Sequence, residues 1–422
     1  MRNKTIYLDN AASTPIDKKV VTEMVKAAKF YGNPSSYNDC GRQAREYLEK
    51  ARLKVARFLG THSDEITFIT SGTEANNLAI QGIAKNLLRY CVTALQPKLK
   101  PHIVTTKIEH PSVLRPIERL EKEGFDVSYL SVDKEGFVNI DELQKTLRPE
   151  TVLVSVMYAN NEIGTIEPIA KISKVIRDFR DGNIEIPARS SGGSKYRNLR
   201  REKFPIFHVD ACQATEYLDM NVNRLGVDLL TFNGSKIYGP KGIGVLYVRK
   251  GVNISSVLLG GEQEAGLRAG TENLMAIGGL VVALDRIESK EGERVGGLRD
   301  FFIEKIERLL PDVKINGPVD KRLAKSFIHR LPNNVNISVP GLTSEILLLE
   351  LDKYGICAGS GSACTSHSVE PSHVLKAIGL DKKYLDGALR FSMGRHTTKK
   401  DIDYVLKVLP KIIKDLRKRY KV

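Results

Sequence analysis

Short apolar runs alternate with amphipathic stretches along roughly the first 260 residues of the chain. Seven runs rich in β-branched residues have the length of a strand: Ile66–Ile69, Ile103–Thr106, Val127–Leu130, Val152–Met157, Ile206–Val209, Leu229–Phe232 and Gly244–Val248. Stretches between them, such as Ser112–Glu123 and Ile169–Arg180, place apolar residues at helical spacing. Nearly continuous apolar strands that alternate with helices are typical of a mostly parallel sheet covered by helices. We therefore predict an α/β fold.

The pattern changes after about Gly261. Longer helical stretches then dominate, and they are separated by few strand-like runs: the helical Leu274–Leu310 and Ser344–Tyr354, a final helix from about Lys400, and the strand-like Val335–Val339 and Ala388–Ser392. Mixed elements in this order indicate a second, smaller α+β domain.

The composition fits an ordinary folded protein, since 41% of the 422 residues are hydrophobic and 27% are charged. No apolar run approaches the roughly 20 residues that span a bilayer. Residues 1–12 contain no apolar core of a signal peptide, so we expect a cytoplasmic protein. The five cysteines are an odd number, which favours free thiols over a disulfide framework.

The net charge of +15 comes from 65 Lys and Arg against 50 Asp and Glu. These basic residues are spread along the chain, with local concentrations at 195–203 and 414–422. Because binding to phosphates needs a patch rather than a total charge, we expect a solvated surface and no direct nucleic-acid binding. Residues 181–204 are polar, basic and contain Ser-Ser-Gly-Gly-Ser, which predicts a mobile surface loop.

Two candidate catalytic residues follow strand-like runs. Lys236 lies after the turn Asn233-Gly234-Ser235 and before a Gly/Pro-rich loop. It is either an ordinary loop lysine or an amine placed to form a Schiff base with an aldehyde cofactor. Asp210 either caps the next helix or keeps a pyridinium nitrogen protonated.

Three other strand ends carry polar motifs with similar alternatives. The stretch Thr70–Asn77 opens a helix with hydroxyl residues and a glycine, which suits either a phosphate cradle or an N-cap. His110 is either structural or a ring that stacks on a planar cofactor. Asn160 follows the run Val152–Met157, where an amide could bind a phenolate oxygen or a substrate carboxylate.

A loop of very small residues, Ser360–Ser366, surrounds Cys364 and predicts an exposed, reactive thiol. Cys357, Cys364, His367 and His373 fall close together in the sequence. Their spacing matches none of the usual structural zinc sites, so we predict no metal.

Together these motifs resemble the class I cysteine desulfurases, which serve nitrogenase and iron–sulfur cluster assembly. These are pyridoxal 5'-phosphate (PLP) enzymes of the aspartate-aminotransferase fold type. The matching stretches span nearly the whole chain in order: Tyr7–Ala12, Gly32–Ser36, Gly72–Glu74, Glu109-His110, Asn160–Gly164, His208–Gln213, Gly234–Gly244, Arg268–Thr271, Ser360–Ser366 and Ala388–Ser392.

The resemblance implies a role for each matching residue. Lys236 carries PLP covalently, Asp210 pairs with its ring nitrogen and Gln213 with its phenolate oxygen, while His110 stacks on the ring and acts in proton transfer. The resemblance also implies that the phosphate is bound by Gly72, Thr73, Asn233 and Ser235. It implies a homodimer in which Thr271 of the partner subunit reaches the same phosphate. Asn160 is expected to contact the cofactor and the substrate carboxylate, and Arg390 to bind that carboxylate.

The implied reaction converts L-cysteine to L-alanine and leaves a persulfide on Cys364. The sulfur then passes to an acceptor protein of iron–sulfur cluster assembly or tRNA thiolation. Another PLP enzyme of the same fold type, such as a selenocysteine lyase, is the alternative. The expected domains are residues 1–15, which join the small domain, 16–262, which bind PLP, and 263–422, which carry the cysteine loop.

The chain departs from the family pattern at several positions. Asn233 replaces a common serine, Ser235 a histidine that usually contacts phosphate, and Cys212 a threonine or serine. Asn38 stands where a histidine is often found. The insertion at 181–204 is longer than in relatives, and the chain ends at Val422 without the tail that some relatives use for docking. These changes leave the expected chemistry in place and the acceptor open.

Overall fold

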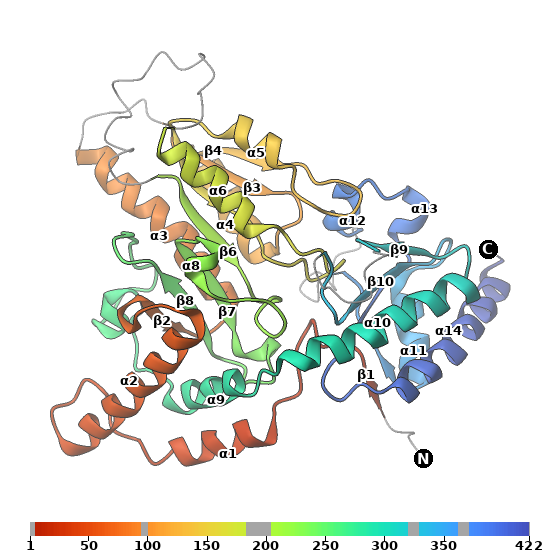
Figure 1. The fold of residues 1–422 in the computed structure, drawn as a ribbon, viewed down its shortest axis with the longest axis horizontal. Coiled ribbons are helices and arrows are strands. Elements are labelled where there is room, and N and C mark those ends of the chain that lie inside the picture. Colours follow the sequence, from red (N-terminus) through yellow and green to blue (C-terminus); the bar gives the residue numbers. More distant parts are fainter. Residues whose placement is uncertain (1–4, 94–99, 183–203, 320–328, 362–370, 422) are drawn as a thin grey trace.

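The computed structural model describes residues 5–93, 100–182, 204–319, 329–361 and 371–421. Its largest sheet has seven strands in the order β2-β8-β7-β6-β5-β3-β4 (Figure 1). The strands are β2 (Ile66–Ile69), β3 (His102–Thr106), β4 (Asp126–Leu130), β5 (Thr151–Ser155), β6 (Ile206–Asp210), β7 (Leu229–Asn233) and β8 (Gly244–Val248). The five from β7 to β4 pair in parallel, and only β8 runs antiparallel to its neighbours β2 and β7.

Helices cover both faces of this sheet, which is why β3, β5 and β6 are buried along their whole length. On one face, α3 (Gly72–Thr93) and α4 (Pro111–Lys122) pack through residues such as Leu78 and Ile117. The opposite face is covered by α2 (Asp39–Leu59), α6 (Ile169–Arg180), α8 (Val222–Leu225) and α9 (Leu274–Asp285). The predicted α/β class and its strands are confirmed to within one or two residues.

A smaller unit has its own sheet, β12-β10-β9, and its own core. Its strands are β9 (Lys314–Asn316), β10 (Asn334–Ser338) and β12 (Ala388–Ser392), and its main helices are α10 (Ser289–Leu309), α11 (Ser344–Lys353) and α14 (Lys399–Tyr420). The short α12 (His373–Ala377) and α13 (Lys382–Leu385) pack beside Ile108 and Met157 of the large unit.

The N-terminal strand β1 (Ile6–Tyr7) pairs in parallel with β11 (Ile356–Cys357), so the start of the chain joins the small unit. From there the chain crosses to the large unit through α1 (Lys18–Ala27) (Figure 1). The remaining helix, α5 (Ile140–Thr146), lies between β4 and β5 in the sequence.

The expected domain boundary at residue 262 precedes a helical stretch that the structure divides. The stretch 274–310 is not one helix but two, α9 and α10, and α9 packs against α1 and α2 in the core of the large unit. Its sequence LMAIGGLVVALD is apolar on all sides, and such a helix is stable only when it is buried all round. We therefore propose that the small unit begins with α10.

No helix among the described residues is long and apolar enough to cross a membrane. The predicted loop at 181–204 falls almost entirely outside the described residues, and so do residues 94–99.

Candidate active site

A cavity of about 240 Å³ lies where the N-terminus of α3 meets the loops that follow β6 and β7. Polar groups that are distant in sequence line it: Gly72, His110, Asp210, Gln213, Ser235, Lys236 and Arg390. Because parallel strands end at the same edge of a sheet, the sequence alone places several of these side chains close together. The structure confirms that they share one cavity.

Lys236 ends a short 3₁₀ turn, Gly234–Lys236, that directly follows β7. Its Nζ donates hydrogen bonds to the carbonyl oxygens of Ala11, at 2.8 Å, and Ala12, at 2.5 Å. Gln213 Nε2 donates to the same Ala11 oxygen at 3.0 Å. The segment after β1 therefore forms one wall of the cavity and holds both side chains, a contact that the motif Tyr7–Ala12 did not reveal by itself.

Asp210 is the last residue of β6 and is 6% exposed. Its Oδ1 accepts the backbone N–H of Cys212 at 3.0 Å, and its Oδ2 accepts Asn76 Nδ2 at 2.7 Å. Asn76 was not predicted as a site residue. It lies four residues after Gly72, on the same face of α3, and this helical spacing was the available signal.

His110 is the N-cap of α4, and its Nδ1 accepts the backbone N–H of Ser112 at 3.1 Å. Burial lowers the pKa of His110, and the positive charges of Lys236 and His373 add to this effect, while Asp210 opposes it. The ring beside the cavity is therefore neutral at physiological pH.

The opposite end of the cavity suits an anion. Gly72 and Thr73 open the long helix α3, whose first N–H groups have no partner within the helix. A Cβ on Gly72 would lie 2.6 Å from Cys212 Sγ and 2.9 Å from Asn233 Nδ2, so any larger residue would force these side chains to move. Ser235 Oγ donates to Asn233 Oδ1 at 3.1 Å. Three residues that depart from the family pattern thus meet at this end, because Asn233 also donates from Nδ2 to Cys212 Sγ at 3.5 Å.

Asn161 lines the cavity where the sequence led us to expect Asn160. The Asn160 side chain is fully buried, with Nδ2 donating to Ile108 O at 3.0 Å and Oδ1 accepting from Glu162 N at 2.9 Å. Those bonds shape its own loop and leave it out of the cavity lining, which contains Asn161 instead. The structure therefore places Asn161, and not Asn160, in the lining of the cavity, and the role expected for Asn160 stays a prediction.

Arg390 lies on β12 of the small unit and is 1% exposed. Its Nη1 donates to Asn161 O at 3.0 Å and its Nη2 to Asp9 Oδ1 at 2.9 Å. No partner for its buried Nε exists among the described residues. A buried guanidinium with an unused donor at the cavity is suited to bind a carboxylate.

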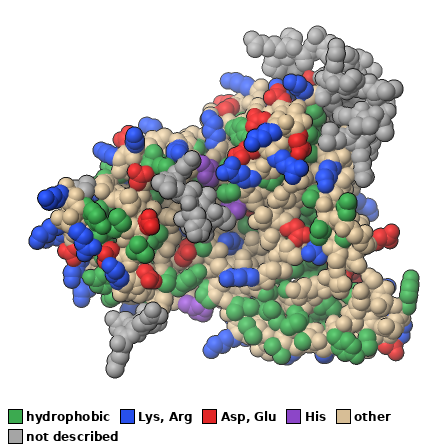
Figure 2. Space-filling model, turned by 180° about the vertical axis from the view of Figure 1, so that it is seen from behind, with side chains coloured by type: hydrophobic (Ala, Val, Ile, Leu, Met, Phe, Trp, Pro, Cys, Tyr) green, Lys and Arg blue, Asp and Glu red, His purple; other side chains and the backbone are tan. Residues whose placement is uncertain are grey.

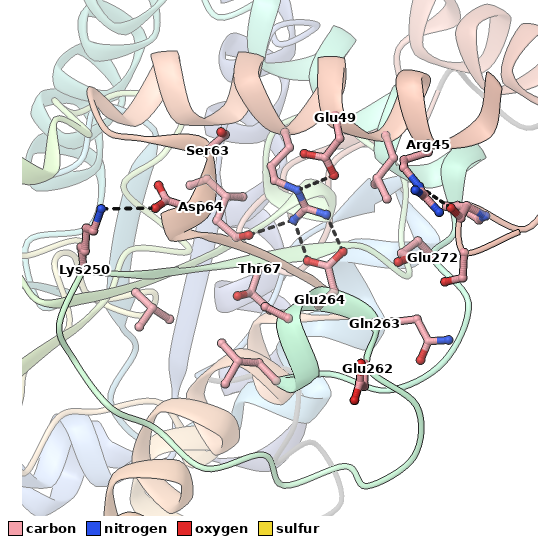
Figure 3. A pocket seen from close by; sticks show the side chains of 18 of the residues that line it. Arg45, Glu49, Ser63, Asp64, Thr67, Lys250, Glu262, Gln263, Glu264 and Glu272 are labelled. Atoms are coloured by element: carbon pink, nitrogen blue, oxygen red, sulfur yellow. Dashed lines mark hydrogen bonds and ion pairs between the residues drawn. The ribbon is translucent and has the colours of Figure 1, made fainter. Parts of the chain in front are cut away.

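Thr271 does not line this cavity. It borders a separate small hollow with Arg268 and Ile243. The loop before it carries Glu264, whose carboxylate binds Arg52 through two hydrogen bonds of 2.7 and 2.8 Å. Figure 3 shows Glu264 pointing toward the helix that carries Arg45 and Glu49, across a pocket of about 650 Å³. Thr271 is thus held away from the cavity of its own chain.

The predicted nucleophile Cys364 lies outside the described residues. Of the thiols that the structure describes, Cys212 borders the cavity. Burial raises the pKa of Cys212 well above its usual value, and the charge of Asp210 raises it further. Within the described ranges, no group of three or more His, Cys, Asp or Glu side chains is arranged to hold a metal ion.

These residues fit PLP. The helix N-terminus with its closely packed glycine suits a phosphate, Asp210 suits a protonated ring nitrogen, and the amine of Lys236 suits an aldehyde. The cavity also places the buried, partly unpaired Arg390 where the carboxylate of an amino acid would bind.

Comparisons with known proteins agree with this site. The aminotransferase class-V family matches residues 6–184 and 196–405. The chain is 44% identical to the cysteine desulfurase IscS of Dictyoglomus turgidum, over 98% of this chain and 96% of the relative. A solved NifS-like protein has 33% identity and a TM-score of 0.82, over 97% of this chain and 100% of that one. The cysteine desulfurase from Thermococcus onnurineus NA1 has 26% identity and a TM-score of 0.78, over 97% and 95%.

The names of these relatives favour a desulfurase over the selenocysteine lyase that the sequence left as an alternative. Their matches run through both units of the fold and through every described wall of the cavity. The chain therefore belongs to the aminotransferase class-V family, within the PLP-dependent cysteine desulfurases.

Proposed function

We propose that this desulfurase converts L-cysteine to L-alanine and holds the sulfur as a persulfide on Cys364. The observation that carries the proposal is the meeting of Lys236, Asp210 and Arg390 at one cavity. It joins a Schiff-base amine, an acid for a pyridinium nitrogen and a site for the substrate carboxylate.

Bound PLP supplies an electron sink for the negative charge left at the substrate α-carbon. Asp210 sustains that sink by keeping the ring nitrogen protonated, and Gln213 donates to the ring oxygen. Arg390 and Asn161 orient the substrate through its carboxylate. The amine of Lys236 would accept the α-proton of the substrate. Its hydrogen bonds to Ala11 and Ala12 aim the amine across the cavity.

The sulfur step needs a thiolate, because the thiol itself is a poor nucleophile. The Cys364 thiolate attacks the substrate sulfur and the substrate C–S bond breaks. The electron pair of the broken C–S bond stays on the substrate β-carbon. A proton then converts this carbon to the methyl group of alanine. Cys212 does not suit this step, because burial keeps its thiol protonated.

We further propose a homodimer in which Thr271 of the partner subunit completes the phosphate site. Apolar side chains are exposed near α1, in the following turn and on the loop before Thr271: Val21, Val25, Tyr31, Tyr37, Leu258 and Leu259. Figure 2 shows hydrophobic side chains gathered at its lower right, over the end of the molecule that carries α1 and α2. A contiguous apolar surface of this kind marks an interface.

The acceptor of the sulfur is proposed to be a protein of iron–sulfur cluster assembly or tRNA thiolation, in the cytoplasm. The resemblance to the class I group supports this assignment. The absence of a membrane-spanning helix among the described residues is compatible with it.

Product analysis tests the reaction. The protein is loaded with PLP and given L-cysteine plus a thiol reductant, and alanine and sulfide are measured. We expect equal amounts of both from the wild type and from Cys212→Ser, and neither from Cys364→Ser. Full turnover by Cys364→Ser would refute the assigned nucleophile.

A further inference from the structure

A chain of hydrogen bonds joins Asp210 to His110 through two side chains that the mechanism above does not use. Asn76 Nδ2 lies 2.7 Å from Asp210 Oδ2 and 2.8 Å from Ser112 Oγ. Ser112 Oγ in turn lies 2.8 Å from His110 Nδ1. Asn76 is fully buried and Ser112 is 7% exposed, so water cannot readily replace these bonds.

Asp210 fixes the direction of the first bond. A carboxylate only accepts, so the amide group that faces it must be the NH₂ of Asn76. This nitrogen has two hydrogens, and the second points to Ser112 Oγ at 2.8 Å. Ser112 Oγ is therefore an acceptor on that side.

Ser112 then donates toward His110. A hydroxyl oxygen can accept two hydrogen bonds, so the bond from Asn76 does not by itself fix the hydroxyl hydrogen. The backbone N–H of Ser112 makes His110 Nδ1 an acceptor, and the hydroxyl hydrogen therefore goes to that nitrogen. The backbone N–H of Ser112 donates to the same Nδ1 at 3.1 Å. A ring nitrogen that accepts two hydrogen bonds carries no proton, so the proton of the neutral ring lies on Nε2.

We propose that Asn76 and Ser112 are positioning residues that hold His110 as the neutral tautomer protonated on Nε2. The inference rests on the proposed role of His110 beside the cofactor. In this proposal the charge of Asp210 sets the direction of the whole hydrogen-bond chain. The carboxylate orients Asn76, Asn76 orients Ser112, and Ser112 selects the tautomer of His110.

Burial is the main cause that lowers the pKa of His110 and favours the neutral form, and the nearby positive groups add to it against the opposing charge of Asp210. His110 is the N-cap of α4, where the positive end of the helix dipole disfavours an imidazolium. Lys236 after β7 and His373 on α12 also lower the pKa of His110, and only Asp210 on β6 raises it. His373 is held there by a 2.9 Å contact between its Nε2 and the carbonyl oxygen of Glu109.

The consequence concerns the proton of the substrate. A neutral imidazole with its proton on Nε2 presents a hydrogen-bond donor there, and its other nitrogen is already occupied. His110 thus acts as a stacking ring and a donor, while the proton transfer at the α-carbon falls to Lys236.

Nitrogen NMR of the holoenzyme labelled with ¹⁵N-histidine tests this directly. The two ring nitrogens of His110, assigned by their loss in His110→Gln, are followed from pH 6 to pH 9. We expect the shifts of an unprotonated Nδ1 and a protonated Nε2 throughout. A proton on Nδ1, or an imidazolium at pH 7, would overturn the proposal.

Asn76→Asp should reverse the direction of the hydrogen bonds between residue 76, Ser112 and His110, while it keeps the shape of the side chain. The new carboxylate can accept from the Ser112 hydroxyl, whose oxygen then accepts from the ring. We expect the Nδ1 signal to shift toward the protonated form. Ser112→Ala, which keeps the backbone donor, should raise the pH at which the ring titrates without reversing the tautomer.

Asn77→Asp is the matched control, since Asn77 is next to Asn76 but bonds to Thr73 O on the outer side of α3. It should leave the His110 signals unchanged. Unchanged signals in both Asn76→Asp and Ser112→Ala would refute the relay. Because the readout is a tautomer, failure of the relay and failure of the catalytic role, tested by the rate of His110→Gln, are separate outcomes.

Discussion

Arg390 is the largest fully buried side chain of the described structure, and it is held only partly by protein groups. Asp9 and Asn161 bind its two terminal nitrogens, while its buried Nε has no partner in the described ranges. A buried donor without a partner is costly. We therefore attribute the missing bond to the carboxylate of the substrate.

Arg390→Gln should weaken substrate binding. The loss of a hydrogen bond to a charged group costs about 1.5–3 kcal/mol, which corresponds to a rise of roughly 10- to 150-fold in KM for L-cysteine. The absorbance of bound PLP should stay unchanged. Arg419→Gln, an exposed substitution far from the cavity, serves as the control. An unchanged KM in Arg390→Gln would show that the guanidinium does not bind substrate.

Single residues were predicted well where a motif names one position, and less well where it names two. Lys236, Asp210, His110 and Gln213 all reach the cavity as expected. The pair Asn160-Asn161 shows the limit, because both asparagines follow the same strand. Which side chain faces the cavity depends on the hydrogen bonds that Asn160 makes within its own turn, and no local pattern reveals those.

At the scale of elements, the strands of the large sheet were predictable because burial on both faces makes each a continuous apolar run. The break between α9 and α10 was not, since residues 286–288 carry no glycine or proline to mark it. Short β1 and β11 were also missed. Two residues are too few for a periodic signal, and their pairing joins opposite ends of the chain.

Glu167 fixes a loop of the large unit and predicts a dependence of stability on pH. Its carboxyl accepts a hydrogen bond from the backbone N–H of Val138 at 3.1 Å. Burial is the main reason that the pKa of Glu167 is raised from 4.5 to about 8. Between these values the unfolded chain releases the proton while the folded chain keeps it. The free energy of unfolding therefore falls as pH rises from about 4.5 to about 8, and this contribution is flat outside that window.

Glu167→Gln removes this titration. The variant should gain stability relative to the wild type as pH rises from 5 to 8, by an amount on the order of a few kcal/mol, measured by urea unfolding at each pH. Glu293→Gln, on the exposed face of α10, should show no such trend. A difference between Glu167→Gln and the wild type that is constant with pH would contradict the raised pKa.

At the scale of the whole molecule, contacts outside the insertion hold the residues on either side of it in place. Arg180, at the end of α6, donates from Nε to Pro205 O at 2.9 Å and pairs with Asp228. Replacement of residues 186–202 by a short Gly/Ser link should therefore preserve PLP binding and alanine release in the absence of an acceptor. Loss of the cofactor absorbance would show that the insertion supports the core or the dimer.

The proposed dimer face gives a further expectation at this scale. Leu259 is 81% exposed on the loop that leads to Thr271. Leu259→Glu should shift the protein toward monomer in sedimentation velocity and lower its PLP occupancy. Leu349→Glu, 60% exposed on α11 of the small unit, should do neither. A dimer of unchanged stability in Leu259→Glu would place the interface elsewhere.

Sulfur is proposed to leave L-cysteine at this cavity and to arrive on Cys364. Mass spectrometry of peptides, after a brief pulse of L-cysteine and rapid alkylation of the PLP-loaded protein, measures this arrival directly. We expect one added sulfur on the peptide that contains Cys364, and none on the peptide of Cys212, whose buried thiol stays protonated. Added sulfur on Cys212 with none on Cys364 would contradict it.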